Sequence, residues 1–145
     1  MTKFALLALS LLVCLASFSC QTYTSGLKQS LTAADETAAT GTLRTIALAQ
    51  RTYSITSGDY GTFKQLSDGG YLDSRFNSDK PAIKDYVLTM VVTPKGEGKA
   101  EGFYSCNADP TREQAGRHFY IDSTSSDLHV NPTAPATAND PIVQP

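Results

Sequence analysis

Apolar side chains recur every three or four positions through the first part of the chain. That spacing places them on one face of an α-helix, and the many alanines of the stretch favour the helical conformation. The pattern predicts one long helix over residues 27–55, ending before Gly58. The stripe consists of Leu27, Leu31, Ala34, Ala38, Leu43, Ile46 and Tyr53, and the positions expected off it are Arg44, Gln50 and Arg51.

The pattern changes after Pro81 to an alternation with period two, rich in β-branched and aromatic residues. Such alternation is typical of strands with one buried face. The connections between the runs are short and contain turn residues, which predicts an antiparallel meander. The expected strands cover residues 86–93, 101–108, 118–122 and 127–130.

Between the helix and the first strand, residues 56–83 are dense in glycine, serine and aspartate. Apolar residues nevertheless recur through this link, so we expect a loop held down by its own side chains rather than a flexible linker. These residues are Phe63, Leu66, Tyr71, Leu72 and Phe76.

The expected fold class is α+β, with one long N-terminal helix packed on an antiparallel meander of three to four strands. A sheet this small must have one face covered, and the helix is the available partner. We therefore expect one domain over residues 27–131. Residues 132–145 hold four of the seven prolines and no lysine or arginine, which predicts a Pro-rich disordered tail.

Residues 1–19 have the three parts of a secretory signal peptide. Lys3 supplies the positive charge, an apolar run follows, and Ser17 and Ser19 provide small residues before a cut. The apolar run is about 15 residues long, which is short of the roughly 20 that cross a bilayer. We expect export with cleavage, and residues 20–26 as a short polar tether.

Cys20 directly follows the small residue Ser19, as in a bacterial lipoprotein signal, where such a cysteine becomes the lipidated first residue. The position three before it is Ser17 in place of the usual leucine, so cleavage by the ordinary signal peptidase remains the alternative. Lipidation of Cys20 would supply two or three acyl chains, enough for stable anchoring. The expected location is a membrane, through this lipid, or the periplasm or cell exterior.

Charge and cysteine content restrict the partners. Without residues 1–19 the chain carries 11 lysines and arginines against 14 acidic residues, which argues against nucleic acid. Cys14 leaves with the signal. If Cys20 is lipidated, Cys106 is a lone thiol; if it is not, a Cys20–Cys106 disulfide is possible in an oxidising compartment.

Catalytic and metal-binding patterns are weak throughout. His118 and His129, with Asp122 and Asp127 between them, lie on neighbouring strands, where alternation alone brings such residues together. The turn 122–127 lacks the dense carboxylates and the glycine of a calcium loop. Cys106 is expected to pack in a strand rather than act as a nucleophile. The sequence predicts no enzyme, no cofactor and no metal.

The order of elements resembles type IV pilins and type II secretion pseudopilins. The run LRTIALAQRTY at 43–53 is similar to the end of the pilin helix in a bacterial pilin-like group. Segments 58–66 and 69–76 are similar to the glycine- and tyrosine-rich loop that follows it there, and residues 107–131 to its last strands. The resemblance covers about residues 35–131, and it concerns the scaffold rather than chemistry.

Pilins begin with a prepilin signal and a hydrophobic half-helix, in whose place this chain has a Sec-type signal. The resemblance implies a non-enzymatic exported subunit of a type IV pilus or type II secretion assembly, or a lipid-tethered domain. It also suggests the globular half of a split pilin, completed by a short hydrophobic pilin peptide. The alternative is a small ligand-binding lipoprotein with a pocket between loop 56–83 and the sheet.

Helix length locates the expected docking site. A helix over 27–55 would be about 43 Å long, whereas four strands about 4.8 Å apart span 15–20 Å at most. The N-terminal half of the stripe would then lie beyond the sheet with no partner in this chain. The expected docking residues, for a pilin, pseudopilin or short pilin peptide, are Leu27, Leu31, Ala34 and Ala38.

Overall fold

The computed structural model describes residues 2–96, 102–112 and 116–144, with side chains from Gly26 onward. Two compact units are distinguished, Met1–Ala34 and Asp35–Pro145. The expected signal sequence and Cys20 lie outside the residues whose side chains are described. The elements are α1 (Thr2–Ser57), α2 (Phe63–Asp68), the 3-10 helix η1 (Ser74–Phe76), β1 (Ala82–Ile83), β2 (Tyr86–Thr93), β3 (Phe103–Pro110), β4 (His118–Asp122) and β5 (His129–Asn131).

Helix α1 is longer than the sequence pattern predicts. Residues 20–26, expected as a tether, are helical. The reason is that polarity alone does not end a helix: this stretch contains no proline, and Gly26 is tolerated within a helix at a cost of about 1 kcal/mol. The C-terminal end of α1 falls two residues beyond the expected end, directly before Gly58.

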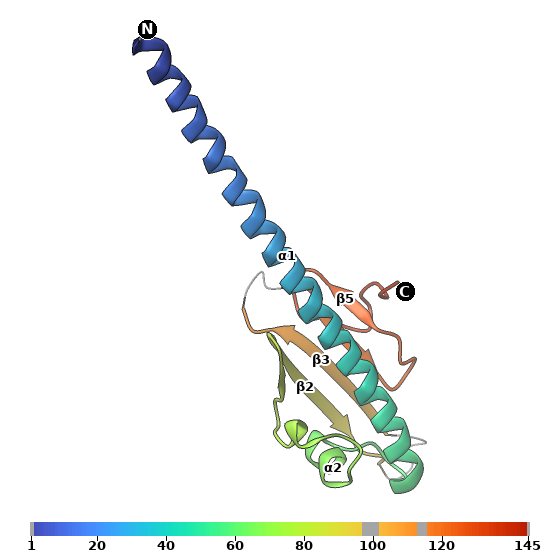
Figure 1. The fold of residues 1–145 in the computed structure, drawn as a ribbon. Coiled ribbons are helices and arrows are strands. Elements are labelled where there is room, and N and C mark those ends of the chain that lie inside the picture. The colour runs from blue at the N-terminus through green and yellow to red at the C-terminus, as the bar shows by residue number, and fades with distance from the viewer. Residues whose placement is uncertain (1, 97–101, 113–115, 145) are drawn as a thin grey trace. The chain divides into compact units, whose positions relative to one another are not determined.

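In the second unit, α1 buries one face against the sheet (Figure 1). Ala39, Leu43, Ile46 and Gln50 are fully buried and follow one another at steps of four, three and four residues. These steps place all four on one side of the helix. The expectation that Gln50 lies off the apolar face was therefore wrong, because helical geometry, not polarity, decides which face a position occupies.

The cost of burying Gln50 is offset by the hydrogen bonds of its side-chain amide. Its Nε2 donates to the carbonyl of Gly61 over 2.6 Å, and its Oε1 accepts from the amide of Gly61 over 2.9 Å. Nε2 also lies 3.1 Å from the Met90 sulfur on β2. The Gln50 side chain thus supplies hydrogen-bond partners for the backbone amide and carbonyl of Gly61. It thereby joins α1 to both the following loop and the sheet.

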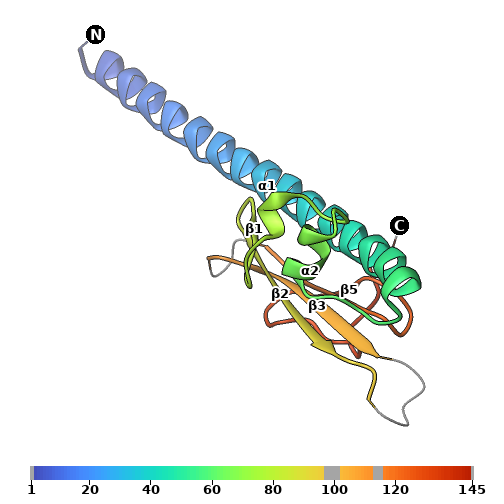
Figure 2. The same cartoon turned by 90° about the horizontal axis from the view of Figure 1, so that it is seen from below.

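The sheet is antiparallel with five strands in the order β1-β2-β3-β4-β5 (Figures 1 and 2). The α+β class is confirmed, but the sheet has one strand more than the three to four expected. The strand that the sequence pattern does not predict is β1, whose two residues pair with the start of β2 across a turn in which Lys84 adopts a φ of 54°. Two residues are too few to show an alternation. The sheet side chains that share one buried cluster with α1 are Tyr86, Leu88, Cys106, Ala108, Phe119 and Ile121.

The link between α1 and the sheet contains two short helices that the turn-rich sequence does not suggest. Thr62 and Gln65 form a capping box that begins α2, and Asp73 caps η1. Phe63 and Phe76, one from each helix, are buried with ring centroids 6.0 Å apart. The link is thus held to the core by its apolar residues, as their recurrence suggests.

The C-terminal residues are ordered, in contrast to the disordered tail expected for 132–145. Val130 N donates to Pro141 O over 2.9 Å, and Val143 N donates to Leu128 O over 2.7 Å, so the tail extends the sheet beyond β5. Ala136 is 2% exposed. Composition misled here because these contacts are made by backbone groups, which a count of prolines and charges does not detect.

We predict that Gln50→Leu destabilises the protein by about 2–4 kcal/mol, because the amide and the carbonyl of Gly61 both lose their partner in a buried site. Urea unfolding followed by circular dichroism measures the change. Thr52→Ala, two positions further on the exposed side, is the matched control and should stay within about 0.5 kcal/mol. Equal stability of Gln50→Leu and the parent protein would contradict the prediction.

Candidate interaction surface

The first unit presents the leucine pair, Leu27 and Leu31, to solvent. Leu27 is 49% exposed and Leu31 is 65% exposed. Ala34, next on the predicted stripe, is also exposed. Ala38 differs from these three, because it is half-buried and packs against the hydrophobic core of the second unit. The structure therefore leaves three of the four expected docking residues open and assigns the fourth to the core.

An ion pair fastens α1 to the start of β4. Arg117 Nη2 lies 2.7 Å from Glu36 Oε2, and the backbone amide of Arg117 donates to Glu36 Oε1 over 3.0 Å. The Glu36 side chain is only 15% exposed. Burial by itself would raise the pKa of Glu36, but the hydrogen bonds and the charge of Arg117 outweigh it and hold the pKa below its usual value.

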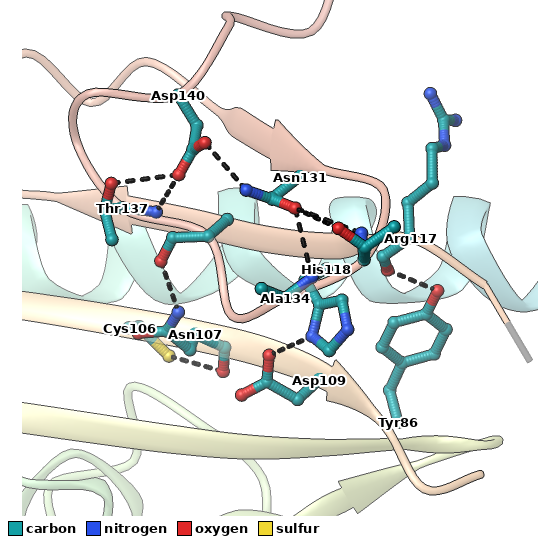
Figure 3. A network of polar contacts seen from close by, with 12 residues as sticks. Tyr86, Cys106, Asn107, Asp109, Arg117, His118, Asn131, Ala134, Thr137 and Asp140 are labelled. Carbon is teal, nitrogen blue, oxygen red and sulfur yellow. Dashed lines mark hydrogen bonds and ion pairs between the residues drawn. The ribbon is translucent and has the colours of Figure 1, made fainter. Parts of the chain in front are cut away.

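Tyr86 and Gly116 complete this contact. Tyr86 Oη donates to the carbonyl of Arg117 over 2.8 Å (Figure 3), and burial raises the pKa of the phenol, so it stays a donor. Gly116 has a φ of +152°, and a Cβ there would collide with Tyr86 Oη. The passage into β4 therefore requires glycine, both for its backbone angle and for the space that the tyrosine occupies.

The face of the sheet away from α1 carries polar side chains that are paired within the chain (Figure 3). Asp109 Oδ1 lies 2.6 Å from His118 Nδ1 on the neighbouring strand. Asn107 Nδ2 donates to Ala136 O over 2.8 Å, so the C-terminal segment is tied to β3. These contacts explain the polar residues as structural, since each one joins two parts of the fold.

The histidines and aspartates weighed as metal ligands have separate partners. His118 faces Asp109, whereas His129 Nδ1 lies 2.7 Å from the carbonyl of Asp140. Asp122 accepts from Tyr120 Oη and from the amide of Thr124, and Asp127 is exposed. Among the described residues, no three groups of the metal-ligating kind gather at one point.

Cys106 is a free thiol in the centre of the core. It lies in β3 between Met90 of β2 and Ile121 of β4, and is 0% exposed. Burial, with a smaller contribution from the charge of Asp109, raises the pKa of the thiol far above its usual value. A reactive cysteine needs an accessible thiolate, so the structure gives Cys106 a packing role.

A shallow hollow runs between α1 and the segment that leads into the sheet. It consists of two adjoining parts, of about 520 Å³ and 410 Å³, which share Thr42, Thr45 and Arg75. Gly41 on one wall leaves the helix backbone open, and Lys84 stands on the other. The hollow lies against α1 and not between the loop and the sheet, where the sequence suggested a pocket.

Two exposed aliphatic residues of α1 escaped the sequence analysis, Leu48 at 66% and Ile55 at 77% exposure. They belong to a repeat, Arg-Thr-x-x-aliphatic, which occurs at 44–48 and again at 51–55. The exact spacing of seven was the signal that could have found them, since it places both copies on one side of a helix.

In the described part of the chain, no helix combines the length and the apolar character needed to cross a membrane. Comparison with known proteins finds no protein-family model, no curated protein and no solved structure that matches this chain.

We predict that the pair of Glu36 and Arg117 stabilises the fold above pH 4.5, the ordinary pKa of a glutamate, and that this contribution is lost as the pH falls through the lower pKa of the folded state. Glu36→Gln should therefore reduce stability at pH 7 by about 1–3 kcal/mol and flatten the decline in acid. Urea unfolding at pH 7 and at pH 3 measures both effects.

The exposed pair of Lys64 and Asp68 is the control, because its two side chains are more than half exposed. Removing it with Lys64→Gln should change stability by less than about 1 kcal/mol. A Glu36→Gln variant that loses no more than this control at pH 7, and keeps the full acid dependence, would refute the role given to Glu36.

Proposed function

We propose that the chain is a non-enzymatic, exported pilin-like subunit. It associates with a type IV pilus or type II secretion assembly, or it is displayed on a membrane as a lipid-tethered domain. In the split-pilin form of the proposal, a separate short hydrophobic peptide supplies the half-helix that pilins carry at their N-terminus, and the leucine pair receives it.

The arrangement of the second unit supports this proposal. A helix laid by one face on an antiparallel meander is the expected layout, and α1 with β2 to β5 has these features. The polar groups that could suggest catalysis have structural partners instead: Asp109 pairs with His118, and Cys106 is sealed in the core. A scaffold whose polar residues serve its own folding suits a subunit better than an enzyme.

The exposure of Leu27 and Leu31 is the observation that carries the proposal. Single exposed leucines are ordinary, but two at a spacing of four form a continuous apolar strip on a helix. Burying each would gain about 1.5–3 kcal/mol. A helical partner that covers both accounts for their presence, and a pilin, a pseudopilin or a short pilin peptide has the required apolar helix.

The N-terminal sequence supports export and anchoring. Residues 1–19 have the composition of a secretory signal, and Ser19-Cys20 suits a lipoprotein cut. A diacylglyceryl group on Cys20 would fix the domain to a membrane, close to the partners named above.

The hollow beside α1 favours a second candidate, a small ligand-binding lipoprotein. Its lining by Thr42, Thr45, Arg75 and Lys84 would suit a small polar ligand. Against this, the hollow is shallow, whereas small-molecule sites enclose most of their ligand. An experiment can distinguish the two candidate functions, because Thr45→Trp would fill the hollow and leave the leucine pair unchanged.

Changing Leu27 and Leu31 together to serine tests the proposal. We expect the thermal midpoint of the protein to stay within about 2 °C, because both side chains are exposed. Co-purification of pilin or pseudopilin subunits from membranes of the native host, identified by mass spectrometry, should be lost. Val91→Ser, on an exposed residue of β2, is the control and should keep the partner.

Leu43→Ser gives the opposite reference, since Leu43 is fully buried and its loss should lower the midpoint strongly. A double mutant of the leucine pair that unfolds like Leu43→Ser would place these leucines in a core and remove the basis of the proposal. Retention of every pilin-type partner by a stable double mutant would also contradict it.

A further inference from the structure

The exposed side of α1 in the second unit has a regular chemistry that the proposed function does not use. Arg44, Leu48, Arg51 and Ile55 follow one another at steps of four, three and four residues, and all are exposed. At 100° per residue, Leu48 lies about 200° from Ile46, so this Arg–aliphatic face is opposite the buried face. The sheet lies along the other side of this part of α1 (Figure 2).

The charge of this face is uniform. Between Thr37 and Gly58 the sequence contains no acidic residue, and the charged residues of this stretch are Arg44 and Arg51. Neither arginine takes part in an ion pair with any residue that the structure describes. Two guanidinium groups one heptad apart, each beside an exposed aliphatic side chain, make this a basic amphipathic surface.

The hydroxyl groups around the face are satisfied by the helix itself. Thr45 donates to Gly41 O over 3.0 Å, and Thr52 donates to Leu48 O over 2.9 Å. Ser54 donates to the carbonyl of Arg51 over 2.9 Å. A serine or threonine that bonds back to its own helix needs no water for its proton, so this surface can enter a water-poor layer at low cost.

We propose that the Arg–aliphatic face lies in the headgroup layer of an anionic membrane. Leu48 and Ile55 would enter the boundary of the acyl chains, and Arg44 and Arg51 would bind lipid phosphates. This surface is separate from the leucine pair, and its ligand is a lipid headgroup layer rather than a pilin helix. The inference therefore goes beyond the proposed function and does not depend on it.

The size of the face favours a membrane over an acidic protein. Residues 44 to 55 span roughly 16 Å of a helix about 10 Å wide. A stable interface with a globular protein buries about 800 Å² on each partner, several times this footprint. The leucine pair differs in this respect, because its proposed partner is a single apolar helix and not a globular acidic protein. The repeat also covers two heptads, whereas a coiled coil needs at least three or four. A lipid surface has no such minimum, since each basic group adds its own attraction.

The test uses residues 20–145, the chain expected after cleavage, with Cys20→Ser, so that a thiol-reactive, polarity-sensitive fluorophore attaches at one introduced cysteine and Cys106 stays buried. Thr52→Cys places the fluorophore on the face, and Thr111→Cys places it at an exposed position outside the helix. Each protein is mixed with vesicles of phosphatidylcholine, or of an equimolar mixture of phosphatidylcholine and phosphatidylglycerol. Fluorescence lifetimes give the ratio of membrane-bound to water-exposed label.

We expect the label at residue 52 to move into an apolar environment on the anionic vesicles only, and the label at residue 111 to stay in water. Arg44→Gln with Arg51→Gln should lower the bound ratio at residue 52 by about thirtyfold, or roughly fivefold for each arginine. Lys80→Gln with Lys84→Gln removes the same charge elsewhere and should leave the ratio unchanged.

Four results would overturn the proposal. The label at residue 52 could ignore anionic vesicles, or it could respond equally to neutral ones. The lysine variant could lower the bound ratio as much as the arginine variant, which would show that binding depends on the net charge of the protein and not on this face. A response at residue 52 to soluble polyglutamate, and not to vesicles, would assign the face to an acidic protein partner.

Discussion

The side-chain amide of Gln50 is the interaction on which the second unit depends. It is fully buried, and it exchanges two hydrogen bonds with the backbone of Gly61 while touching Met90 of β2. Helix, loop and sheet are thereby joined at one point. Gly61 has no room for a side chain, because a Cβ would lie 2.9 Å from the ring of Tyr53. The close approach that glycine permits brings its backbone within reach of the glutamine, and the paired amide makes the burial of both groups favourable.

With Gln50 holding α1 to the loop and the sheet, the two sides of α1 have different roles. The buried side runs through Leu43 and Ile46 to Gln50, and Glu36 secures its other end to β4 through Arg117. The exposed side is free of structural duties, so its residues can serve contacts outside the chain. A helix that is clamped at both ends of its buried face cannot roll on the sheet. The orientation of any exposed face is then set by the core, which is a requirement for a surface that recognises a partner or a membrane.

The sequence predicts the α+β class and four of the strands because both depend on periodicity, which is a local property. It does not predict β1, since two residues carry no period, nor the ordered tail, since backbone pairing leaves no mark in composition. Glu36 and Arg117 are 81 residues apart, and no local pattern connects them. The candidate surface was partly predictable: Leu27, Leu31 and Ala34 are exposed, but Ala38 belongs to the core. Helical spacing identifies the apolar stripe of α1, but it does not show at which residue the core stops covering that stripe.

Native-state hydrogen exchange at the amide of Gly61 tests the central role of Gln50 most directly. Amides in surface loops exchange through small local openings, whereas amides in the most stable part of a protein exchange only on global unfolding. If Gln50 holds the loop to the core, the amide of Gly61 exchanges with the same free energy as the amide of Leu43 on the buried face of α1. Exchange of Gly61 at a much lower free energy, together with Gly58 and while Leu43 stays protected, would show that the loop opens independently. The Gln50 contact would then be a consequence of the fold and not its support.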